Sequence, residues 1–268
     1  MKKIINKQFG WRPALPDVRD YVLTMTTTAE KDSVDGRDEC SPVIDQGDLG
    51  SCTGQALVYL LERLQRKMFD RHTDLSALFS YYTGRYEMGE FGDVGCTLRD
   101  VMKAAVKFGI CPEKDWPYDI KLFDEEPPIL AAASAAVFRP KAYYRLDPPG
   151  AEKKSILNNA LHLLAAGYSL IAGFSVFSSI NDGPDIPFPS DNDSVLGGHA
   201  IHIIGFNKNR MHRLVNSGTG AFQIQNTWGD DWGDGGYGWL PFEYLFRGLM
   251  SDLWTAELLA APDLGIFG

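Results

Sequence analysis

The sequence predicts an α+β protein, because segments with helical periodicity precede most of the segments with strand character. Three amphipathic segments come first, at Cys52 to Met68, Leu98 to Phe108 and Glu152 to Ala166. Short segments rich in β-forming residues follow, at Ser169 to Phe177, His199 to Phe206, Arg213 to Asn216, Ala221 to Thr227 and Tyr237 to Leu240. Such segregation, in a chain of 268 residues, favours two compact lobes.

Each expected helix has one apolar stripe and a recognisable end. In the first, which should begin at Cys52 or Thr53, apolar side chains recur at steps of three and four: Leu57, Leu60, Leu61, Leu64 and Met68. The second buries Val101, Met102, Ala105 and Val106, and ends where Gly109 suits a helix C-terminus. The third buries Ile156, Leu157, Ala160, Leu161 and Leu164, and ends at Gly167.

The chain divides into an N-terminal extension and one main domain. Residues 1–33 are turn-rich and polar, although Trp11, Leu15, Tyr21 and Val22 could dock on the rest. Residues 34–268 form the domain, with a helical lobe over about 41–138 and a β lobe over about 139–268. The connection between the lobes is expected near Glu125 to Pro128 or at Pro148-Pro149. A long acidic loop, Asn181 to Ser194, precedes His199.

Composition excludes several classes of partner. The formal net charge is −9 and no long Lys/Arg run exists, which argues against a nucleic acid or an anionic membrane surface. No apolar stretch reaches the length of a membrane-spanning helix. Residues 1–10 lack the apolar core of a signal peptide, so we expect a cytoplasmic location or export by another route. Four cysteines allow at most one disulfide beside a catalytic thiol, and reduced cysteines are the simpler expectation.

Cys52 is the first candidate for chemistry. A glycine-bearing turn precedes it, and it stands where the first helix should begin. The positive end of a helix dipole favours the thiolate, which is the nucleophilic form of sulfur. Gln46, six residues earlier, could fold back and donate an N–H toward the same space, forming an oxyanion hole with the Cys52 amide. A buried structural cysteine and an ordinary loop glutamine are the alternatives.

His199 is the candidate acid and base. It lies at the mouth of an apolar strand, after Gly197-Gly198, and its near-neutral pKa suits proton transfer from a thiol and to a leaving amine. A structural strand histidine is the alternative. His202 should face the other side of the strand, and the spacing of the two histidines does not fit a helical zinc motif.

The segment from Gln225 to Gly238 carries the most specific signal. Two Trp-Gly pairs, at Trp228 and Trp232, favour an ordered turn that presents aromatic surface. Asn226 ahead of them could hold a histidine ring in one orientation, with Trp228 shielding that hydrogen bond from water. An aromatic-rich core loop is the alternative.

Three motifs in order resemble the papain/cathepsin family of cysteine peptidases. They are Gln-x5-Cys, Gly-His-Ala followed by an apolar strand, and Asn-Thr-Trp-Gly-x-x-Trp-Gly-x-x-Gly-Tyr, and the likeness runs from about Val34 to the C-terminus. The resemblance implies a two-lobed fold, mainly helical on one side and β-barrel-like on the other, with the active site between the lobes. It assigns four catalytic roles: Cys52 as nucleophile, His199 as base, Asn226 as its orienting residue and Gln46 in the oxyanion hole.

The resemblance also implies where a peptide substrate would bind. Gly92 to Thr97 matches the strand that holds the substrate backbone, and Leu98 would line the pocket for the second residue before the cut. The implied substrate-binding residues are Gly95, Cys96, Thr97, Leu98, Gly198, Trp228 and Trp232. No metal or organic cofactor is implied. The family's long propeptide has no room here, so residues 1–33 are the candidate for a segment that covers the cleft.

The sequence departs from the family pattern in several places. Leu49 stands where secreted members have half of a disulfide, Gly198 replaces the usual Asp or Asn, and Asn226 lies unusually far from Cys52 along the chain. An extended connection over Asn207 to Gly220 would account for that distance. The predicted activity is peptide hydrolysis through a thioester. Two alternatives stay open: an inactive homologue that only binds peptides, and an aminopeptidase or amide-transfer enzyme on the same fold.

Overall fold

A computed structural model describes residues 7–25, 29–70, 72–211 and 219–258. Its helices are α1 (Cys52–Phe69), α2 (Ala77–Met88), α3 (Leu98–Phe108), α4 (Ile129–Ala135), α5 (Lys153–Ala165) and α6 (Glu243–Phe246), with short 3-10 turns η2 (Arg37–Glu39) and η3 (Ile120–Leu122). Its strands are β1 (Ser33–Val34), β2 (Pro140–Arg145), β3 (Leu170–Phe177), β4 (Val195–Met211), β5 (Thr219–Gln225), β6 (Tyr237–Pro241) and β7 (Met250–Leu258). The predicted α+β class and the two-lobed papain-like fold are confirmed.

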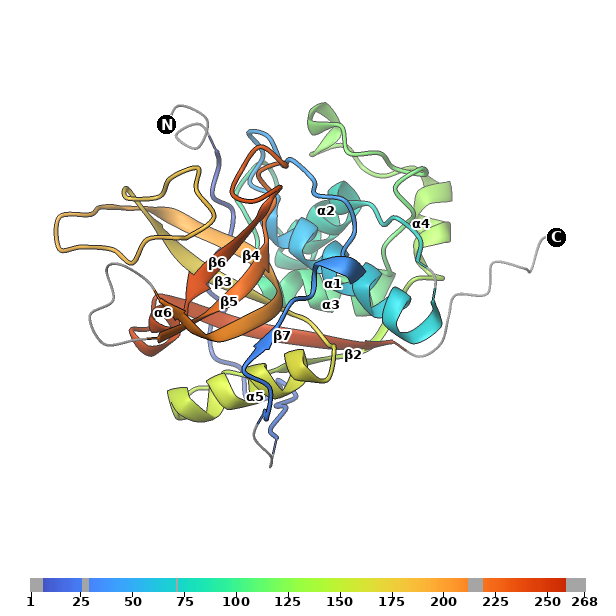
Figure 1. Cartoon of the computed structure of the whole chain (residues 1–268). Coiled ribbons are helices and arrows are strands. Elements are labelled where there is room, and N and C mark those ends of the chain that lie inside the picture. The colour runs from blue at the N-terminus through green and yellow to red at the C-terminus, as the bar shows by residue number, and fades with distance from the viewer. Residues whose placement is uncertain (1–6, 26–28, 71, 212–218, 259–268) are drawn as a thin grey trace.

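One antiparallel sheet forms the β side of the molecule. Its strand order is β2-β7-β3-β4-β5-β6, and β1 pairs with β4. Figure 1 shows this sheet on one side and helices α1 to α4 on the other. A strand sends successive side chains to opposite faces, and the two faces of β3 follow this rule. Ile171 packs in the core with α1, whereas Leu170 and Ala172 pack in the second core with α5.

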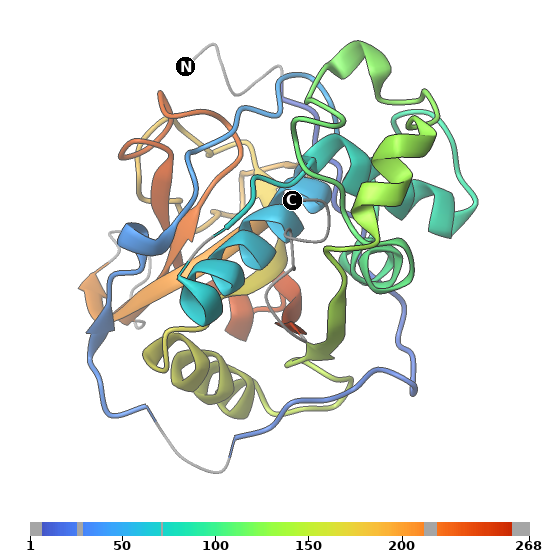
Figure 2. The same ribbon diagram turned by 90° about the vertical axis from the view of Figure 1, so that its right-hand side faces the viewer.

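Helix α1 joins the two sides. It packs against α2 and α3 and also against β4, and Figure 2 shows it running across the middle of the molecule. Its residues Leu57, Leu60 and Leu61 are buried, and so is the polar Gln55, because the helix has neighbours on nearly every side. Its first residue, Cys52, therefore lies deep between the two lobes.

The sequence missed six elements, of which β1 and α6 are very short and the other four were missed for a physical reason. Helix α2 carries no apolar stripe, because aromatic and polar side chains are buried all around it between α1 and α3. Helix α4 is only two turns long and follows two prolines. Strands β2 and β7 pair with each other, and a residue at positive φ, Asp252, interrupts β7. The strand predicted at Arg213 to Asn216 lies outside the described residues.

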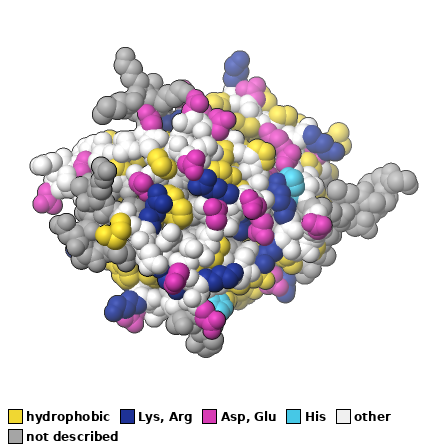
Figure 3. Space-filling view, in the orientation of Figure 1, with side chains coloured by type: hydrophobic (Ala, Val, Ile, Leu, Met, Phe, Trp, Pro, Cys, Tyr) yellow, Lys and Arg dark blue, Asp and Glu magenta, His cyan; other side chains and the backbone are white. Residues whose placement is uncertain are grey.

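The surface carries charges of both signs. Figure 3 shows acidic and basic side chains interspersed over one face, rather than gathered by sign. Among the described residues, no helix combines the length and the apolar character that a membrane crossing needs. All four cysteines are described and none forms a disulfide.

Candidate active site

Helix α1 presents Cys52 as its first residue. The preceding residue, Ser51, makes no capping hydrogen bond from its side chain, so the first amides of α1 are left free to face the sulfur. The Ala200 amide, from β4, donates to Cys52 Sγ at 3.4 Å. Since Ala200 directly follows His199, the sulfur and the histidine belong to one site between the lobes.

His199 is held by Asn226 across two neighbouring strands. Its Nε2 lies 2.8 Å from Asn226 Oδ1, which also accepts from the Thr227 amide at 2.8 Å. The other ring nitrogen, Nδ1, is buried and has no hydrogen-bond partner among the described residues. With the Nε2 proton given to Asn226, Nδ1 is the nitrogen with a free lone pair.

Aromatic rings enclose the histidine. The Trp228 ring lies over it at 4.5 Å between centroids, and Phe174 meets it edge-on at 5.8 Å. Trp232 packs against Trp228, with the two rings nearly perpendicular and their centroids 5.4 Å apart. Its indole N–H donates to Asn181 O. These rings shield the bond between His199 and Asn226 from water.

Gln46 is oriented by a neighbour that the sequence did not single out. The Thr227 hydroxyl donates to Gln46 Oε1 at 2.6 Å, and the backbone N–H of Gln46 donates to the backbone oxygen of Thr227 at 2.8 Å. The side-chain Nε2 is thereby turned away from Thr227. It donates to Leu49 O and to Gln8 O, each at 2.9 Å.

The acceptor Gln8 belongs to a segment, residues 7–14, that lies in the cleft; we call it the strap. In Figure 1 the dark-blue N-terminal trace passes between the sheet and the helices. Gly10 O accepts from Cys96 N at 2.8 Å, and Arg12 N donates to Cys96 O at 3.0 Å. From the other lobe, Gly198 O accepts from Trp11 N at 2.9 Å. The strap therefore bonds to both walls of the cleft.

Two aromatic side chains of the strap fill the site. The Phe9 ring meets His199 edge-on at 6.3 Å and Trp228 at 6.2 Å. Trp11 is only 7% exposed, and its Nε1 donates to Asp252 Oδ2 at 3.2 Å. A Cβ on Gly173 would lie 1.9 Å from the Trp11 indole, so the indole lies directly against the backbone of β3.

The strap changes the protonation of the site, because it helps to exclude water. Burial raises the pKa of Cys52 to about 11, and the amides of Ala200, Gly10 and Thr53 offset this only in part. Burial lowers the pKa of His199 to about 4, against the opposing effect of Asn226. The expected thiolate is therefore wrong for this closed state, since desolvation outweighs the helix terminus.

The structure places the implied substrate-binding residues unevenly. Cys96 and Gly198 make the backbone bonds to the strap, and Gly95 approaches Gly10 closely. Thr97 instead caps α3, accepting from the Asp100 amide at 3.0 Å, and Leu98 is fully buried in the helical core. His202 faces the other side of β4, where its ring nitrogens meet Gln225 and Ser169.

Among the contributors to this site that sequence reasoning missed are Thr227, Gly173 and Asp252. Thr227 lies inside the Asn-Thr-Trp motif, so the motif itself was a usable signal. Gly173 and Asp252 come from β3 and β7, and their meeting with Trp11 spans more than 150 residues of chain, which no local pattern reveals.

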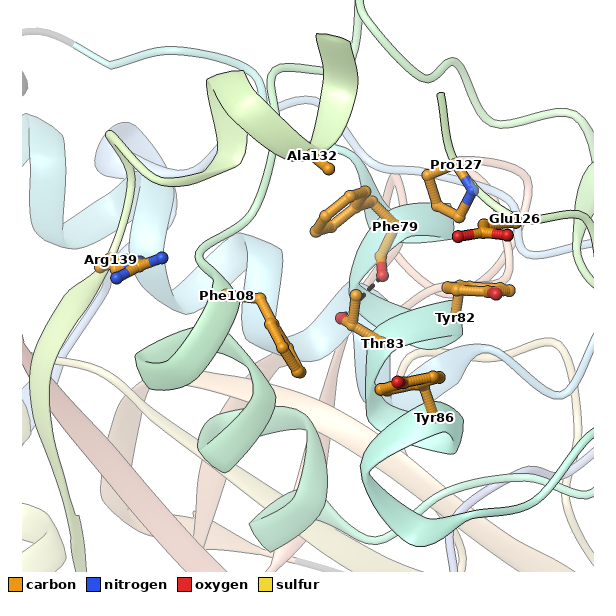
Figure 4. Close-up of a pocket in the computed structure, with 9 residues that line it drawn as sticks. All are labelled: Phe79, Tyr82, Thr83, Tyr86, Phe108, Glu126, Pro127, Ala132 and Arg139. Atoms are coloured by element: carbon orange, nitrogen blue, oxygen red, sulfur yellow. Dashed lines mark hydrogen bonds between the residues drawn. The ribbon is translucent and has the colours of Figure 1, made fainter. Parts of the chain in front are cut away.

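A second hollow lies elsewhere, between α2, α3 and α4. It measures about 270 Å³ and is lined by Phe79, Tyr82, Thr83, Tyr86, Phe108, Glu126, Pro127, Ala132 and Arg139. Figure 4 shows its aromatic rings around an open space, with the Thr83 hydroxyl bonded to Phe79 O. None of these residues belongs to the cleft described above.

The fold is papain-like, and comparison with known proteins agrees. The model of the papain family cysteine protease matches residues 30–243. The chain belongs to this family.

Individual relatives are similar over most of the chain. An uncharacterized peptidase C1-like protein of Acanthamoeba polyphaga mimivirus is 30% identical, over 98% of this chain and 91% of that protein. Mouse cathepsin K is 27% identical, over 88% and 68%. Among solved structures, xylellain, a cysteine protease from Xylella fastidiosa, is 29% identical with a TM-score of 0.77, over 95% of this chain and 97% of that one.

Proposed function

We propose that this chain is a cysteine peptidase, with Cys52 as nucleophile, that the strap holds in a latent state. The observation that carries the proposal is the histidine geometry. Asn226 holds Nε2 of His199 by a hydrogen bond, while Nδ1 is buried without a hydrogen-bond partner among the described residues. The next residue, Ala200, donates its backbone N–H to the Cys52 sulfur. A structural histidine would have both nitrogens satisfied, as His202 does.

The proposed reaction begins when the strap leaves. Nδ1 of His199 takes the thiol proton, and the sulfur attacks a peptide carbonyl carbon. Gln46 Nε2 and the Cys52 amide donate to the oxyanion that forms. His199 then protonates the leaving amine, and water activated by the same histidine cleaves the thioester. Thr227 and Asn226 act as positioning residues.

The strap itself lies in a position that cannot react. Gln8 O occupies the hydrogen bond that Gln46 would give to an oxyanion. The Gly10 amide N–H, however, lies close enough to the Cys52 sulfur to lower its pKa. Since this contact is to an amide hydrogen and not to a carbonyl carbon, we infer that the strap blocks the site without being cut.

Latency is tested by loosening the strap in the full chain. A Cβ on residue 10 would lie 1.7 Å from Gly50 O, so the double substitution Gly10→Ala/Trp11→Ala, called the opened variant below, should expel the strap. We expect it to cleave an unstructured protein at least tenfold faster than the wild type. Val18→Ala, at a fully exposed side chain outside the strap but within the N-terminal extension, is the control.

The same experiment tests the chemistry. Cys52→Ala in the opened variant should remove all cleavage, and mass spectrometry of the products separates internal cuts from cuts at free N-termini. An opened variant whose activity survives Cys52→Ala would refute the proposal. Equal rates in the wild type and the opened variant would refute latency alone.

A further inference from the structure

The strap side chain that is held most deeply lies in a pocket built by the β lobe and the cleft wall. The Trp11 indole lies on the Gly173 backbone of β3, and its ring also approaches Gly198 of β4. The Trp11 backbone pairs with Cys96, within the segment Gly92 to Thr97 that is expected to hold a substrate backbone. When the strap leaves, a hollow of the size of an indole opens beside the reactive sulfur.

A carboxylate forms the floor of this pocket. Asp252 Oδ1 pairs with Arg145 at 3.1 Å, within the protein. Its other oxygen, Oδ2, accepts from two donors of the strap and, among the described residues, from no other group: Trp11 Nε1 at 3.2 Å and Ala14 N at 2.8 Å. Withdrawal of the strap therefore leaves one buried carboxylate oxygen with both of its partners removed, pointing into the vacated pocket.

Charges around the pocket are mixed. Arg145 also pairs with Asp147 and Asp20, and Arg99 pairs with Asp20. Because both signs are present, net charge gives little preference for a cation. Once the strap has left, Oδ2 lacks a hydrogen-bond donor. Leaving a buried acceptor unpaired costs more free energy than a typical hydrogen bond contributes.

We propose that Asp252 is a specificity-determining residue, which selects substrates whose pocket-bound side chain is large and ends in an N–H donor, as tryptophan does. This inference rests on the proposed function. It narrows the proposed substrate from peptides in general to one class of peptides. The strap shows which side chain the pocket accepts, and Oδ2 of Asp252 is the atom that recognises it.

The test uses peptides that differ in one atom group. Tryptophan is placed at each residue before the cut in turn, and at the position it favours most it is compared with 3-benzothienylalanine, which has the same shape but no N–H, and with leucine. In the opened variant we expect kcat/KM for tryptophan to exceed that for benzothienylalanine by about tenfold or more. A ratio near one would overturn the inference.

Asp252→Asn identifies the responsible group. Arg145 has only donors, so the new amide should turn its oxygen to Arg145 and its N–H to the pocket. Asparagine also tolerates the positive φ of 55° at this position. We expect the tryptophan preference to vanish or reverse. A preference that survives in a folded Asp252→Asn protein would overturn the inference.

Two further measurements keep the outcome decisive. Gly173→Ala in the opened variant places a methyl group where the indole lies, so it should weaken both aromatic peptides by about tenfold or more while sparing leucine. Binding of the same peptides to the opened variant with Cys52→Ala separates recognition from chemistry. If no peptide is cleaved but tryptophan still binds more tightly than benzothienylalanine, only the proposed function fails. If the two bind equally, the inference fails.

Discussion

The protonation of Cys52 depends on what covers it. In the closed state burial raises its pKa to about 11, from an ordinary value near 9, and lowers the pKa of His199 from about 6.5 to about 4. Both groups are therefore neutral near pH 7, and the attacking thiolate is scarce. Removing the strap readmits water, which stabilises the charged forms of both groups.

Alkylation of Cys52 should therefore depend on pH differently with and without the strap in place. A raised pKa means that the neutral thiol favours the closed state; this contribution is complete below about pH 9 and is lost as the pH rises through about 11. The alkylation rate of Cys52 in the wild type should keep rising up to about pH 11. In the opened variant it should level off below pH 9. Stopped-flow alkylation with iodoacetamide measures both profiles, and superimposable curves would contradict the account.

The Gln46 side chain supplies one of the two proposed oxyanion donors. Gln46→Ala in the opened variant should lower kcat by about 10²- to 10³-fold, because removal of such a donor has that effect in other enzymes. Alkylation of Cys52 forms no oxyanion and should keep its rate. Comparing the two rates separates loss of the donor from general damage to the site.

For single residues, the sequence predicted much of the candidate site. Cys52, His199, Asn226 and Gln46 were named from short motifs, and the structure brings them together through direct hydrogen bonds or adjacent residues. Their catalytic roles are the proposal above. Local motifs predict such groups because the chemistry needs defined neighbours, whereas Asp252 meets Trp11 only through the tertiary fold.

Among the elements, the strap has an unusual dependence on glycine. Two backbones meet where Gly10 faces Gly50, and an indole meets a backbone at Gly173. In each case a single methyl group would occupy space that the strap needs. The strap can therefore be displaced from either side of the contact.

Gly173→Ala, with the strap unchanged, should open the site from the β-lobe side. The new methyl group would overlap the Trp11 indole, while the sheet itself offers no closer neighbour. We expect Cys52 alkylation at pH 7.5 to accelerate about tenfold or more relative to the wild type, since overpacking typically costs about 1–3 kcal/mol. Ala172→Gly, on the opposite face of β3, is the control. Unchanged alkylation in a folded Gly173→Ala protein would contradict the proposed packing.

A single apolar stripe made an element easiest to predict from sequence. Helix α3 was predicted with its observed bounds, because its single apolar stripe faces the core. Helix α2 was missed, because burial on most sides removes the amphipathic pattern. The strap could be named as a candidate cover, but its course through the cleft depends on backbone bonds to Cys96 and Gly198 that no sequence pattern predicts.

Across the whole molecule, one buried ion network ties the N-terminal segment to the β lobe. Arg145 on β2 pairs with Asp20, Asp147 and Asp252, which come from three separate parts of the chain. Burial raises the pKa of Asp147, and that of Asp252 to about 6, so these carboxylates depend on the guanidinium to stay charged.

Arg145→Ala should therefore destabilise the protein by about 3–5 kcal/mol at pH 7.5, because it leaves buried carboxylates without a partner. The loss should shrink toward pH 4.5, since protonation removes the unpaired charges. Urea denaturation at the two pH values measures it. Lys141→Ala, on the same strand as Arg145, removes an exposed pair with Glu257 of β7 and should leave stability nearly unchanged. Equal losses at both pH values would contradict this role of the network.

Labelling of the opened variant with a thiol-directed peptide inhibitor tests the assignment of Cys52 as the nucleophile. We expect one label per chain, located at Cys52 by mass spectrometry, with peptidase activity lost in proportion to labelling. The half-buried Cys40 is the internal control and should stay unlabelled at the same reagent concentration. Full labelling of Cys52 with activity retained, or loss of activity through labelling of Cys40, would contradict the claim.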